Sequence, residues 1–239
     1  MDNIFLVALS GCSSSGKSVT IAKVIAQICP DITLIHEDDF YKHDDEIPFN
    51  EKRGISNWDS PEALDLAHFE AELDSIKETG QISSQLVHNN NVDDISKFQL
   101  DPNFLQTLRH KLEPISRSTR IVLVDGFMIY NSPKLASKFD LKLFVRAPYE
   151  VLKARRNARP GYQTLDSYWV DPPYYFDEFV YDSYRSSHAH LFIDGDVEGS
   201  LNPQTAADIK EFTNGSGTPL TEALTWTTNE ICEAVSAAH

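Results

Sequence analysis

The sequence has few cysteines, a shortage of positive charge and no long hydrophobic run. Its 239 residues include only three cysteines, Cys12, Cys29 and Cys232, which are too scattered for a disulfide framework and fit a reducing, intracellular compartment. No Cys/His group in the sequence has the spacing of zinc ligands. Lys and Arg number 21 against 36 Asp and Glu, a net charge of −15. Such a surface repels nucleic acid and anionic membranes, so we expect neither as a partner.

The longest apolar run, residues 4–9, is far shorter than the ~20 residues that a membrane-spanning helix needs. No basic leader precedes this run and no small-residue cleavage site follows it, so we expect no secretory signal. Hydrophobic residues make up 41% of the chain and charged residues 24%, which is typical of a globular domain. We therefore expect a soluble, cytoplasmic protein that forms a single domain over residues 1–239.

The order of the apolar segments predicts alternating strands and helices. Residues 4–9 are continuously apolar, as in a strand buried on both faces of a parallel sheet. Further strands are expected at residues 32–35, 121–124, 141–145 and 191–193. Helices are expected at residues 19–28, 61–80, 102–112, 148–159 and 222–235. This alternation predicts a three-layer α/β domain with a mostly parallel central sheet.

The turn after the first strand carries the strongest motif. Residues 11–18 read GCSSSGKS and match the P-loop pattern G-x-x-x-x-G-K-[ST] in full. The glycines let backbone N–H groups point at phosphate oxygens, and the helix that follows directs its positive end at the same anion. In this pattern Lys17 reaches the β- and γ-phosphates of ATP, and Ser18 offers its hydroxyl to Mg²⁺. The predicted nucleotide-binding residues are Gly11, Cys12, Ser13, Ser14, Ser15, Gly16, Lys17 and Ser18.

A second candidate for the metal is Asp125, which directly follows the apolar segment 121–124. P-loop proteins use an acid at a neighbouring strand end to steer Mg²⁺, although an Asp-Gly pair is also common in ordinary turns. A guanine-binding N-K-x-D tetrad is missing, because residues 137–140 read SKFD. The pattern D-x-x-G occurs only at residues 196–199, too late in the chain. A small-molecule kinase is therefore favoured over a switch GTPase.

A basic island interrupts the acidic sequence. Lys153, Arg155, Arg156 and Arg159 fall within seven residues, and the Pro-Gly pair that follows predicts a hinge. Arginines on a closing lid neutralise charge as a phosphoryl group is transferred. The alternative is a solvated helix face paired with acids such as Glu150. Because this island is positively charged in a chain that is otherwise acidic, we favour the first interpretation, a helical lid over about residues 153–178.

Acids also stand where the phosphoryl acceptor is expected. Residues 38–41 read DDFY at the C-terminal end of the second predicted strand, the edge at which open α/β sheets bind ligands. A carboxylate there can accept the proton of an attacking hydroxyl, or it can simply cap a turn. Trp58 and Asp59 are ambiguous. They suit a stacked base and ribose hydroxyls, but composition alone favours a core tryptophan and a helix cap at Asp59 or Ser60.

These motifs resemble those of the nicotinamide riboside kinases, within the wider uridine-kinase-like group of P-loop kinases. The resemblance is carried by ALSGCSSSGKS, IHEDDFYKHD, NWDSPEALD, VDGFMIY, VRAPYEVLKARR and GYQTLDSYWVDPPYYFDEFVYDSY. These segments cover most of residues 1–199, whereas the C-terminal part, with its helix at about 220–239, carries little of the signature. The resemblance implies a P-loop NTPase-type fold. It also implies that Mg-ATP phosphorylates the ribose 5′-hydroxyl of nicotinamide riboside, and also of nicotinic acid riboside, giving the mononucleotide for NAD biosynthesis.

The resemblance also implies roles for single residues. Asp38 is implied as the general base and as a metal ligand with Ser18 and Asp125. Lys17 and Arg156 are implied to stabilise the transferred charge, with Arg156 also facing the substrate and Arg155 and Arg159 facing ATP. The implied substrate-binding residues are Asp38, Asp39, Phe40, Tyr41, Trp58, Asp59, Arg156 and Tyr162. Asp59 is implied to bind ribose hydroxyls, which reverses the capping preference, and Val197, Glu198 and Gly199 fall near the adenine contact.

Two other functions stay open from the sequence. One is a uridine/cytidine-type nucleoside kinase, and the other is a non-catalytic nucleotide sensor. A Trp58–Tyr162 sandwich without an obvious reader of a pyrimidine edge favours a flat cationic ring. Some relatives have tyrosine at the position of Trp58 and glutamate at that of Asp125, and an extra residue before Tyr162 makes the lid arginine assignment ambiguous by one position. We expect a monomer or a weak homo-oligomer.

Overall fold

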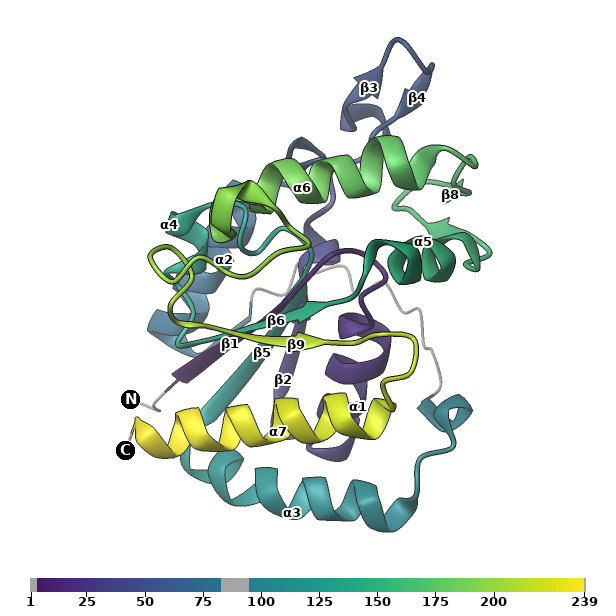
Figure 1. The fold of residues 1–239 in the computed structure, drawn as a ribbon. Coiled ribbons are helices and arrows are strands. Elements are labelled where there is room, and N and C mark those ends of the chain that lie inside the picture. The colour runs from purple at the N-terminus through teal and green to yellow at the C-terminus, as the bar shows by residue number, and fades with distance from the viewer. Residues whose placement is uncertain (1–3, 83–94, 239) are drawn as a thin grey trace.

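A computed structural model describes residues 4–82 and 95–238 of the chain (Figure 1). The polar tract at residues 88–91 lies outside the described residues. The described chain forms a five-stranded sheet in the order β2-β5-β1-β6-β9, in which every neighbouring pair is parallel. Its strands are β1 (Ile4–Ser10), β2 (Thr33–His36), β5 (Arg120–Gly126), β6 (Leu141–Arg146) and β9 (Ile209–Thr213).

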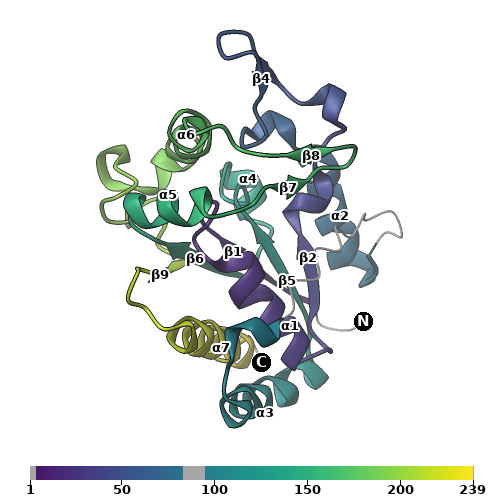
Figure 2. The same ribbon diagram turned by 90° about the vertical axis from the view of Figure 1, so that its right-hand side faces the viewer.

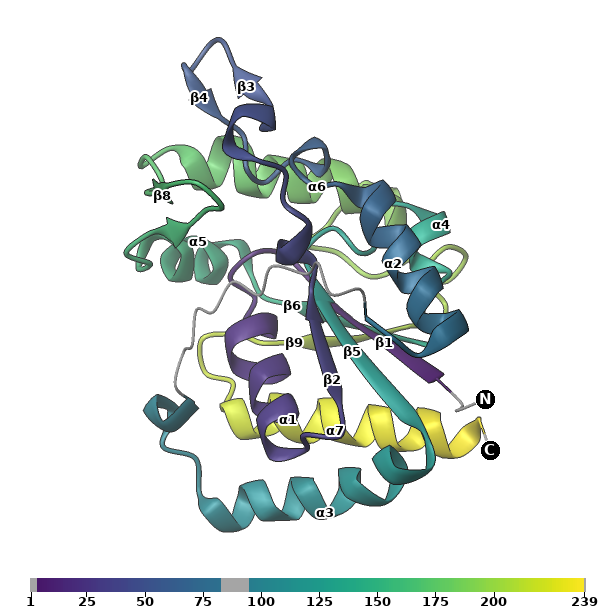
Figure 3. The ribbon, with the colours of Figure 1, turned by 180° about the vertical axis from the view of Figure 1, so that it is seen from behind.

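Helices cover both faces of the sheet, which confirms the three-layer α/β prediction. On one face lie α1 (Lys23–Ile28), α3 (Pro102–Ser118) and α7 (Leu220–Ala237); on the other lie α2 (Leu66–Thr79), α4 (Pro133–Ala136) and α6 (Asp182–His188) (Figures 1 and 3). Every residue of β1 is buried, as its unbroken apolar run predicts. Ile4, Leu6 and Ala8 pack into one core cluster, and the residues between them pack into the other.

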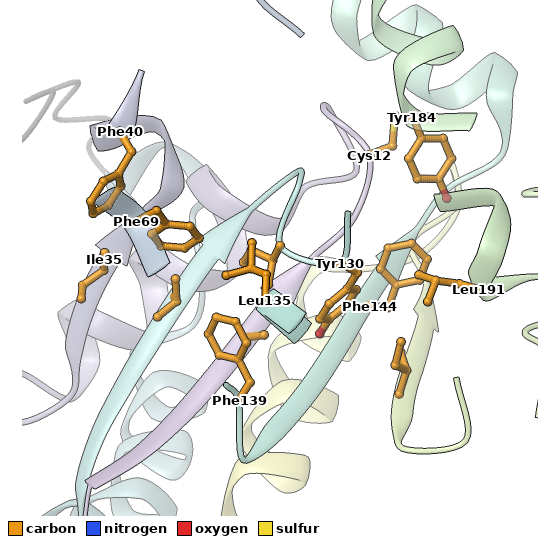
Figure 4. Packing of buried hydrophobic residues seen from close by; sticks show 14 of the residues in the cluster. Cys12, Ile35, Phe40, Phe69, Tyr130, Leu135, Phe139, Phe144, Tyr184 and Leu191 are labelled. Atoms are coloured by element: carbon orange, nitrogen blue, oxygen red, sulfur yellow. The ribbon is translucent and has the colours of Figure 1, made fainter. Parts of the chain in front are cut away.

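The core on the α2 and α6 face is rich in aromatic rings (Figure 4). Phe40 packs against Phe69 with 4.8 Å between ring centroids, and Phe144 lies 5.7 Å from Tyr130. The Tyr130 hydroxyl donates to the carbonyl oxygen of Leu143 at 3.0 Å, so this buried polar group is satisfied. The cluster extends to Cys12, and the turn after β1 therefore rests on a packed core.

The segment predicted to form a lid lies beyond the carboxyl edge of the sheet. β6 leads into α5 (Tyr149–Asn157), which is followed by the hairpin β7 (Tyr162–Gln163) and β8 (Tyr168–Trp169), both beyond the strand ends (Figure 2). A helical turn at Phe176–Tyr181 continues into α6. A second hairpin, β3 (Phe49–Asn50) and β4 (Ile55–Ser56), projects from the body of the molecule within residues 42–60. In the described part of the chain, no helix has both the length and the apolar character that crossing a membrane requires.

The predicted helix at residues 61–80 begins later than expected. A 3₁₀ turn occupies Pro61–Ala63, and α2 starts only after Asp65, whose carboxylate accepts from the His68 amide at 2.9 Å. Ser60 makes no side-chain cap, so the expectation of a cap at that position is wrong. The end of this helix is as predicted, because Gly80 follows it with φ of 71°, a left-handed conformation that glycine adopts without strain.

The strand predicted at residues 191–193 is also wrong. These residues form 3₁₀ turns at Ala189–Leu191 and Ile193–Gly195, and Phe192 makes only an isolated bridge to Leu201. The last strand is β9, which lies at the sheet edge and exposes Lys210 and Glu211. A run of three apolar residues does not distinguish a strand from a buried turn, and a half-exposed edge strand lacks the continuous apolar run that marks the others.

Candidate active site

The loop at residues 11–16 leaves β1 and enters a helical turn at Lys17–Ala22, which continues into α1 (Figure 2). Gly11 and Gly16 have φ of 147° and 94°, which side-chain-bearing residues rarely adopt. A Cβ on Gly11 would collide with the Val145 carbonyl oxygen. The Ser14 and Ser15 hydroxyls are buried without a hydrogen-bond partner among the described residues. Unsatisfied donors at the start of a helix fit an anionic ligand.

The loop after β9 braces this turn from the side. The Asn214 side-chain amide donates to the carbonyl oxygen of Ser15 at 2.8 Å. Arg155 donates to the same oxygen at 3.4 Å and to the carbonyl oxygen of Gly215 at 3.1 Å. The sequence analysis missed Asn214, because its contact with Ser15 spans nearly the whole chain. Arg155, predicted to face ATP, thus lies against the phosphate-binding loop.

The acids predicted for the metal lie together at the ends of β2 and β5. Asp125 is buried and hydrogen-bonds the Ser18 hydroxyl and Nδ1 of His36. Burial alone would raise the pKa of Asp125, but His36, Lys17 and the Ser18 hydroxyl outweigh it and lower that pKa. The carboxylate is therefore ionised. Asp38 lies close enough to interact electrostatically with Asp125 and Lys17.

The pKa of Asp38 is shifted in the opposite direction to that of Asp125. It lies on the 3₁₀ turn Glu37–Phe40, directly after β2. Crowding by protein atoms raises the pKa of Asp38, the charge of Asp125 raises it further, and Lys17 opposes both. Two acids with pKa values pushed in opposite directions are typical of a site where one accepts a proton and the other stays charged.

Ser18, Asp38 and Asp125 offer hydroxyl and carboxylate oxygens, the donors that Mg²⁺ prefers. Across residues 4–82 and 95–238, no group of three or more His, Cys, Asp or Glu side chains is arranged to hold a metal ion. Mg²⁺ commonly takes its remaining ligands from water and phosphate oxygens, so the hydroxyl of Ser18 and the two carboxylates suit its partial coordination.

Glu37 is a buried acid that the sequence analysis missed. Its Oε2 accepts from the amides of Phe127 and Met128 at 2.7 and 2.8 Å. A Cβ on Gly126 would lie 2.5 Å from the same oxygen, so glycine is required there. Burial raises the pKa of Glu37 to about 8. The side chain thus joins the turn that carries Asp38 to the loop that follows Asp125.

Arg156 has all five of its N–H donors engaged. Nε and Nη2 donate to Asp171 at 2.5 and 3.2 Å, Nη1 and Nη2 donate to Asp59 at 3.2 and 3.0 Å, and Nη1 also donates to Ser13 Oγ at 2.7 Å. The guanidinium is only 5% exposed, and the two carboxylates raise the pKa of Arg156 against the effect of burial. One side chain therefore ties the phosphate-binding loop to Asp59 and to the lid.

Asp171 was not predicted from the sequence. It follows β8 and also accepts from the Trp169 indole N–H at 2.8 Å. Asp59, predicted to bind ribose hydroxyls, is buried, and burial raises its pKa, with Arg156 lowering it and Asp171 raising it. A narrow hollow lined by Cys12, Ser13, Asp59 and Met128, among others, lies beside this cluster.

The predicted aromatic pair is not in direct ring contact. Trp58 is buried, with its ring centroid 5.9 Å from that of Tyr41 and 6.3 Å from that of Trp169. The Tyr162 ring lies instead under the Arg156 guanidinium, at 4.5 Å, and its hydroxyl accepts from Arg159 at 2.7 Å. Trp169 is thus an aromatic neighbour of Trp58 that the sequence analysis did not name.

Other predicted substrate and nucleotide residues lie farther from the centre of the cluster. Phe40 is 2% exposed and belongs to the core. Arg146, at the end of β6, donates to the carbonyl oxygens of Val197 and Gly199 at 2.9 and 2.7 Å. Glu198 accepts from the Tyr181 hydroxyl at 2.7 Å. Val197 and Gly199 are thus bonded to the end of β6, and Glu198 is bonded to the helical turn Phe176–Tyr181. Asn214, in contrast, contacts the phosphate-binding loop itself, and Gly215 contacts Arg155 beside it.

The lid hairpin is also anchored to the segment that follows Tyr41. The Ser167 and Thr164 hydroxyls donate to Asp44 at 2.6 and 3.0 Å, and the Asp44 amide donates to Asp166 at 3.1 Å. The hairpin is therefore tied down at two places, by Asp44 at its turn and by the pair of Arg156 with Asp171 after β8.

The chain is similar over nearly its whole length to curated nicotinamide riboside kinases. It is 59% identical to that of Saccharomyces cerevisiae over 95% of each chain. It is 51% identical to that of Eremothecium gossypii (98% of this chain, 93% of that protein) and 35% identical to that of Schizosaccharomyces pombe (96% and 97%). No family model matches the chain. Among solved structures, a putative fructose transport system kinase from Silicibacter sp. TM1040 aligns with a TM-score of 0.48 at 17% identity, covering 89% of this chain and 91% of that one.

Proposed function

The chain belongs to the nicotinamide riboside kinases, and from that membership we propose that it transfers the γ-phosphoryl group of ATP to the ribose 5′-hydroxyl of nicotinamide riboside. The product is the mononucleotide used in NAD biosynthesis. The resemblance found in the sequence motifs is confirmed by these relatives. The observation that carries the proposal is 59% identity over 95% of the chain to a protein named for this activity.

The donor side of the reaction is assigned to the loop at residues 11–18. The triphosphate of ATP would be bound there by the backbone amides of the loop and by the buried Lys17. The Ser14 and Ser15 hydroxyls, which have no hydrogen-bond partner among the described residues, are further donors for it. Ser18, Asp38 and Asp125 would hold Mg²⁺, which when bound offsets the negative charge of the phosphates. Arg155 and Asn214 are proposed to lie beside the bound nucleotide, because both donate to the carbonyl oxygen of Ser15 in the phosphate-binding loop.

The acceptor side is assigned to Asp38, Asp59 and Arg156. A raised pKa makes Asp38 a stronger base than an ordinary aspartate, suited to accept the proton of the 5′-hydroxyl. Asp59 is proposed to bind the remaining ribose hydroxyls, with Asp39 and Tyr41 at the mouth of the site. Arg156, whose donors are all engaged, is proposed to hold the Asp59 carboxylate in place on the substrate side. Arg156, through its bond to Ser13, is also proposed to offset charge on the transferred group, together with Lys17.

Recognition of the pyridine ring is assigned to Trp58 and Tyr162. A cationic ring between aromatic faces gains about 0.5–2 kcal/mol. Nicotinamide riboside has a positively charged ring and uridine does not, so a pair of aromatic faces supports the proposed substrate over the pyrimidine nucleosides.

The test is a coupled assay of ADP release with nicotinamide riboside, nicotinic acid riboside and uridine at equal concentrations. Turnover of nicotinamide riboside is expected, with nicotinic acid riboside as a second substrate. Turnover of uridine alone would overturn the proposal in favour of a uridine/cytidine-type kinase. ATP binding without turnover of any nucleoside would identify a nucleotide sensor.

We also propose that the protein acts in the cytoplasm as a single kinase domain, either as a monomer or as a weak homo-oligomer. Its acidic surface and its scattered cysteines support this proposal. Light scattering over a range of protein concentrations measures the mass directly. A mass of several chains that persists on dilution would contradict it.

A further inference from the structure

His36 is a polar side chain at the centre of the site that the proposed function does not use. It is the last residue of β2 and lies directly opposite Asp125 in the parallel register with β5. Its Nδ1 is hydrogen-bonded to Oδ1 of Asp125. The imidazole is 24% exposed and the Asp125 side chain 4%, so the pair is largely shielded from water.

The chemistry of the pair settles which atom donates. An ionised carboxylate only accepts, so Nδ1 of His36 carries the hydrogen and donates it to Asp125. Asp125 also hydrogen-bonds the Ser18 hydroxyl. A carboxylate fixed by donors from two different elements has little freedom to rotate, and its remaining lone pairs point in a fixed direction.

The bond is not needed to join the strands. The parallel register already pairs four residues of β2 with β5, from Thr33 with Val122 to His36 with Asp125. Buried apolar side chains of the same strands, such as Ile35 and Val124, pack in the core below. The local consequence of the His36 bond is therefore the orientation of the Asp125 carboxylate rather than the formation of the sheet.

We propose that His36 is a positioning residue that aims the Asp125 carboxylate at the metal of the bound Mg-nucleotide complex. Aspartate is one methylene shorter than glutamate, so from the strand its carboxylate reaches less far and depends more on its direction. His36 supplies that direction through Nδ1–H and acts on the metal through Asp125. This inference rests on the proposed function, because it needs a metal-bound nucleotide beside Ser18.

The first experiment compares three variants, His36→Ala, His36→Asn and His36→Gln. Calorimetry measures the affinity for ATP with Mg²⁺ and, separately, with EDTA. Losing a group that orients a metal ligand weakens metal binding by about 10–100-fold, so His36→Ala should weaken Mg-ATP binding at least tenfold and leave metal-free ATP binding unchanged. Asparagine can place an N–H near the position of Nδ1 and should restore most of the affinity, whereas glutamine reaches one atom farther and should not.

Several results would overturn the proposal. These are an equal loss with and without Mg²⁺, an asparagine variant no better than alanine, or an alanine variant with full Mg-ATP affinity. Thermal unfolding of each variant reports whether the fold is kept, and the comparison of asparagine with glutamine decides the question if alanine does not fold. The control is His110→Ala, an exposed histidine on α3, which should change neither affinity.

The second experiment tests whether His36 acts through Asp125. In an Asp125→Asn background, His36→Ala should weaken Mg-ATP binding no further, because the carboxylate that it orients has been removed. Additive losses would contradict the proposal. The wild-type assay with nicotinamide riboside is run alongside. If the His36 variants lose ATP affinity only in the presence of Mg²⁺ but the wild type does not phosphorylate nicotinamide riboside, the proposed function alone is wrong. If the wild type phosphorylates nicotinamide riboside but the variants show no Mg²⁺-specific loss, this inference alone is wrong.

Discussion

Replacing Glu37 by glutamine tests how this buried acid is protonated. Its Oε2 accepts from the Phe127 and Met128 amides, and its Oε1 has no partner among the described residues. Glutamine keeps one oxygen for the two amides and puts an uncharged amide group in place of Oε1. The change therefore removes a titratable proton with little change in shape, so the two proteins should differ mainly in how their stability depends on pH.

The magnitude follows from the raised pKa of Glu37. The carboxyl has an ordinary value of 4.5, and burial raises its pKa in the folded protein to about 8. Between these values the folded state holds a proton that the unfolded state has released, so stability falls as pH rises. The slope is about 1.4 kcal/mol per pH unit, which accumulates to roughly 5 kcal/mol across the window. Glutamine lacks this slope, because it does not titrate.

Urea unfolding of the nucleotide-free protein from pH 5 to pH 8 measures the effect, a range that spans most of the window set by the pKa of Glu37. The Glu37→Gln protein should gain stability relative to wild type as pH rises. Glu46→Gln, which removes an exposed carboxyl on the 3₁₀ turn Asp44–Glu46, reports the background effect of one lost charge. Parallel stability curves for wild type and Glu37→Gln would refute the reasoning, because Glu37 would then ionise in the folded protein as it does in the unfolded chain.

Two further substitutions test the proposed chemistry by steady-state kinetics. Asp38→Asn should lower kcat by at least about 10² while the affinity for metal-free ATP is kept, because the amide cannot accept the proton; near wild-type turnover would count against Asp38 as the base. The raised pKa of Asp38 should also appear in the pH profile of kcat/KM for the wild type, as an acid limb with an apparent pKa above the usual range of an aspartate. An apparent pKa at the ordinary value of an aspartate would contradict this. Asp171→Asn should lower kcat/KM for the riboside about 30-fold, because weaker charged hydrogen bonds to Arg156 cost about 2 kcal/mol. Its matched control, Asp177→Asn, removes a more exposed pair with Lys153 and should change kcat/KM less than threefold; equal effects would contradict the role of Asp171.

The features that the sequence predicted well are local ones. The loop at residues 11–18 needs glycine where φ is positive, and both Gly11 and Gly16 have that conformation. The unbroken apolar run of β1 predicts a strand covered on both faces, which the two core clusters confirm. Asp38 and Asp125 follow two such strands, and parallel strands place their carboxyl ends at one edge. Each of these features depends on fewer than about ten neighbouring residues.

The features that the sequence did not predict join distant segments. Asn214 contacts Ser15, Asp171 and Asp59 share Arg156, and His36 meets Asp125. Each partner looks ordinary in its own segment, as a loop asparagine or a strand-end acid. Such pairs form only once the strand order and the lid hairpin bring their elements together.

The amino-acid sequence thus determined by itself the βαβ start of the chain, the phosphate-binding turn and the family. These depend on the backbone conformations that single residues favour and on the spacing of apolar residues, and both are properties of short segments. The tertiary structure alone decided that Arg156 is buried with all five donors engaged. It also decided that Asp59 binds an arginine rather than capping a helix, and that the sheet ends in β9. The physical reason is that burial and electrostatic pairing depend on distances in space, which the spacing of residues along the chain does not specify.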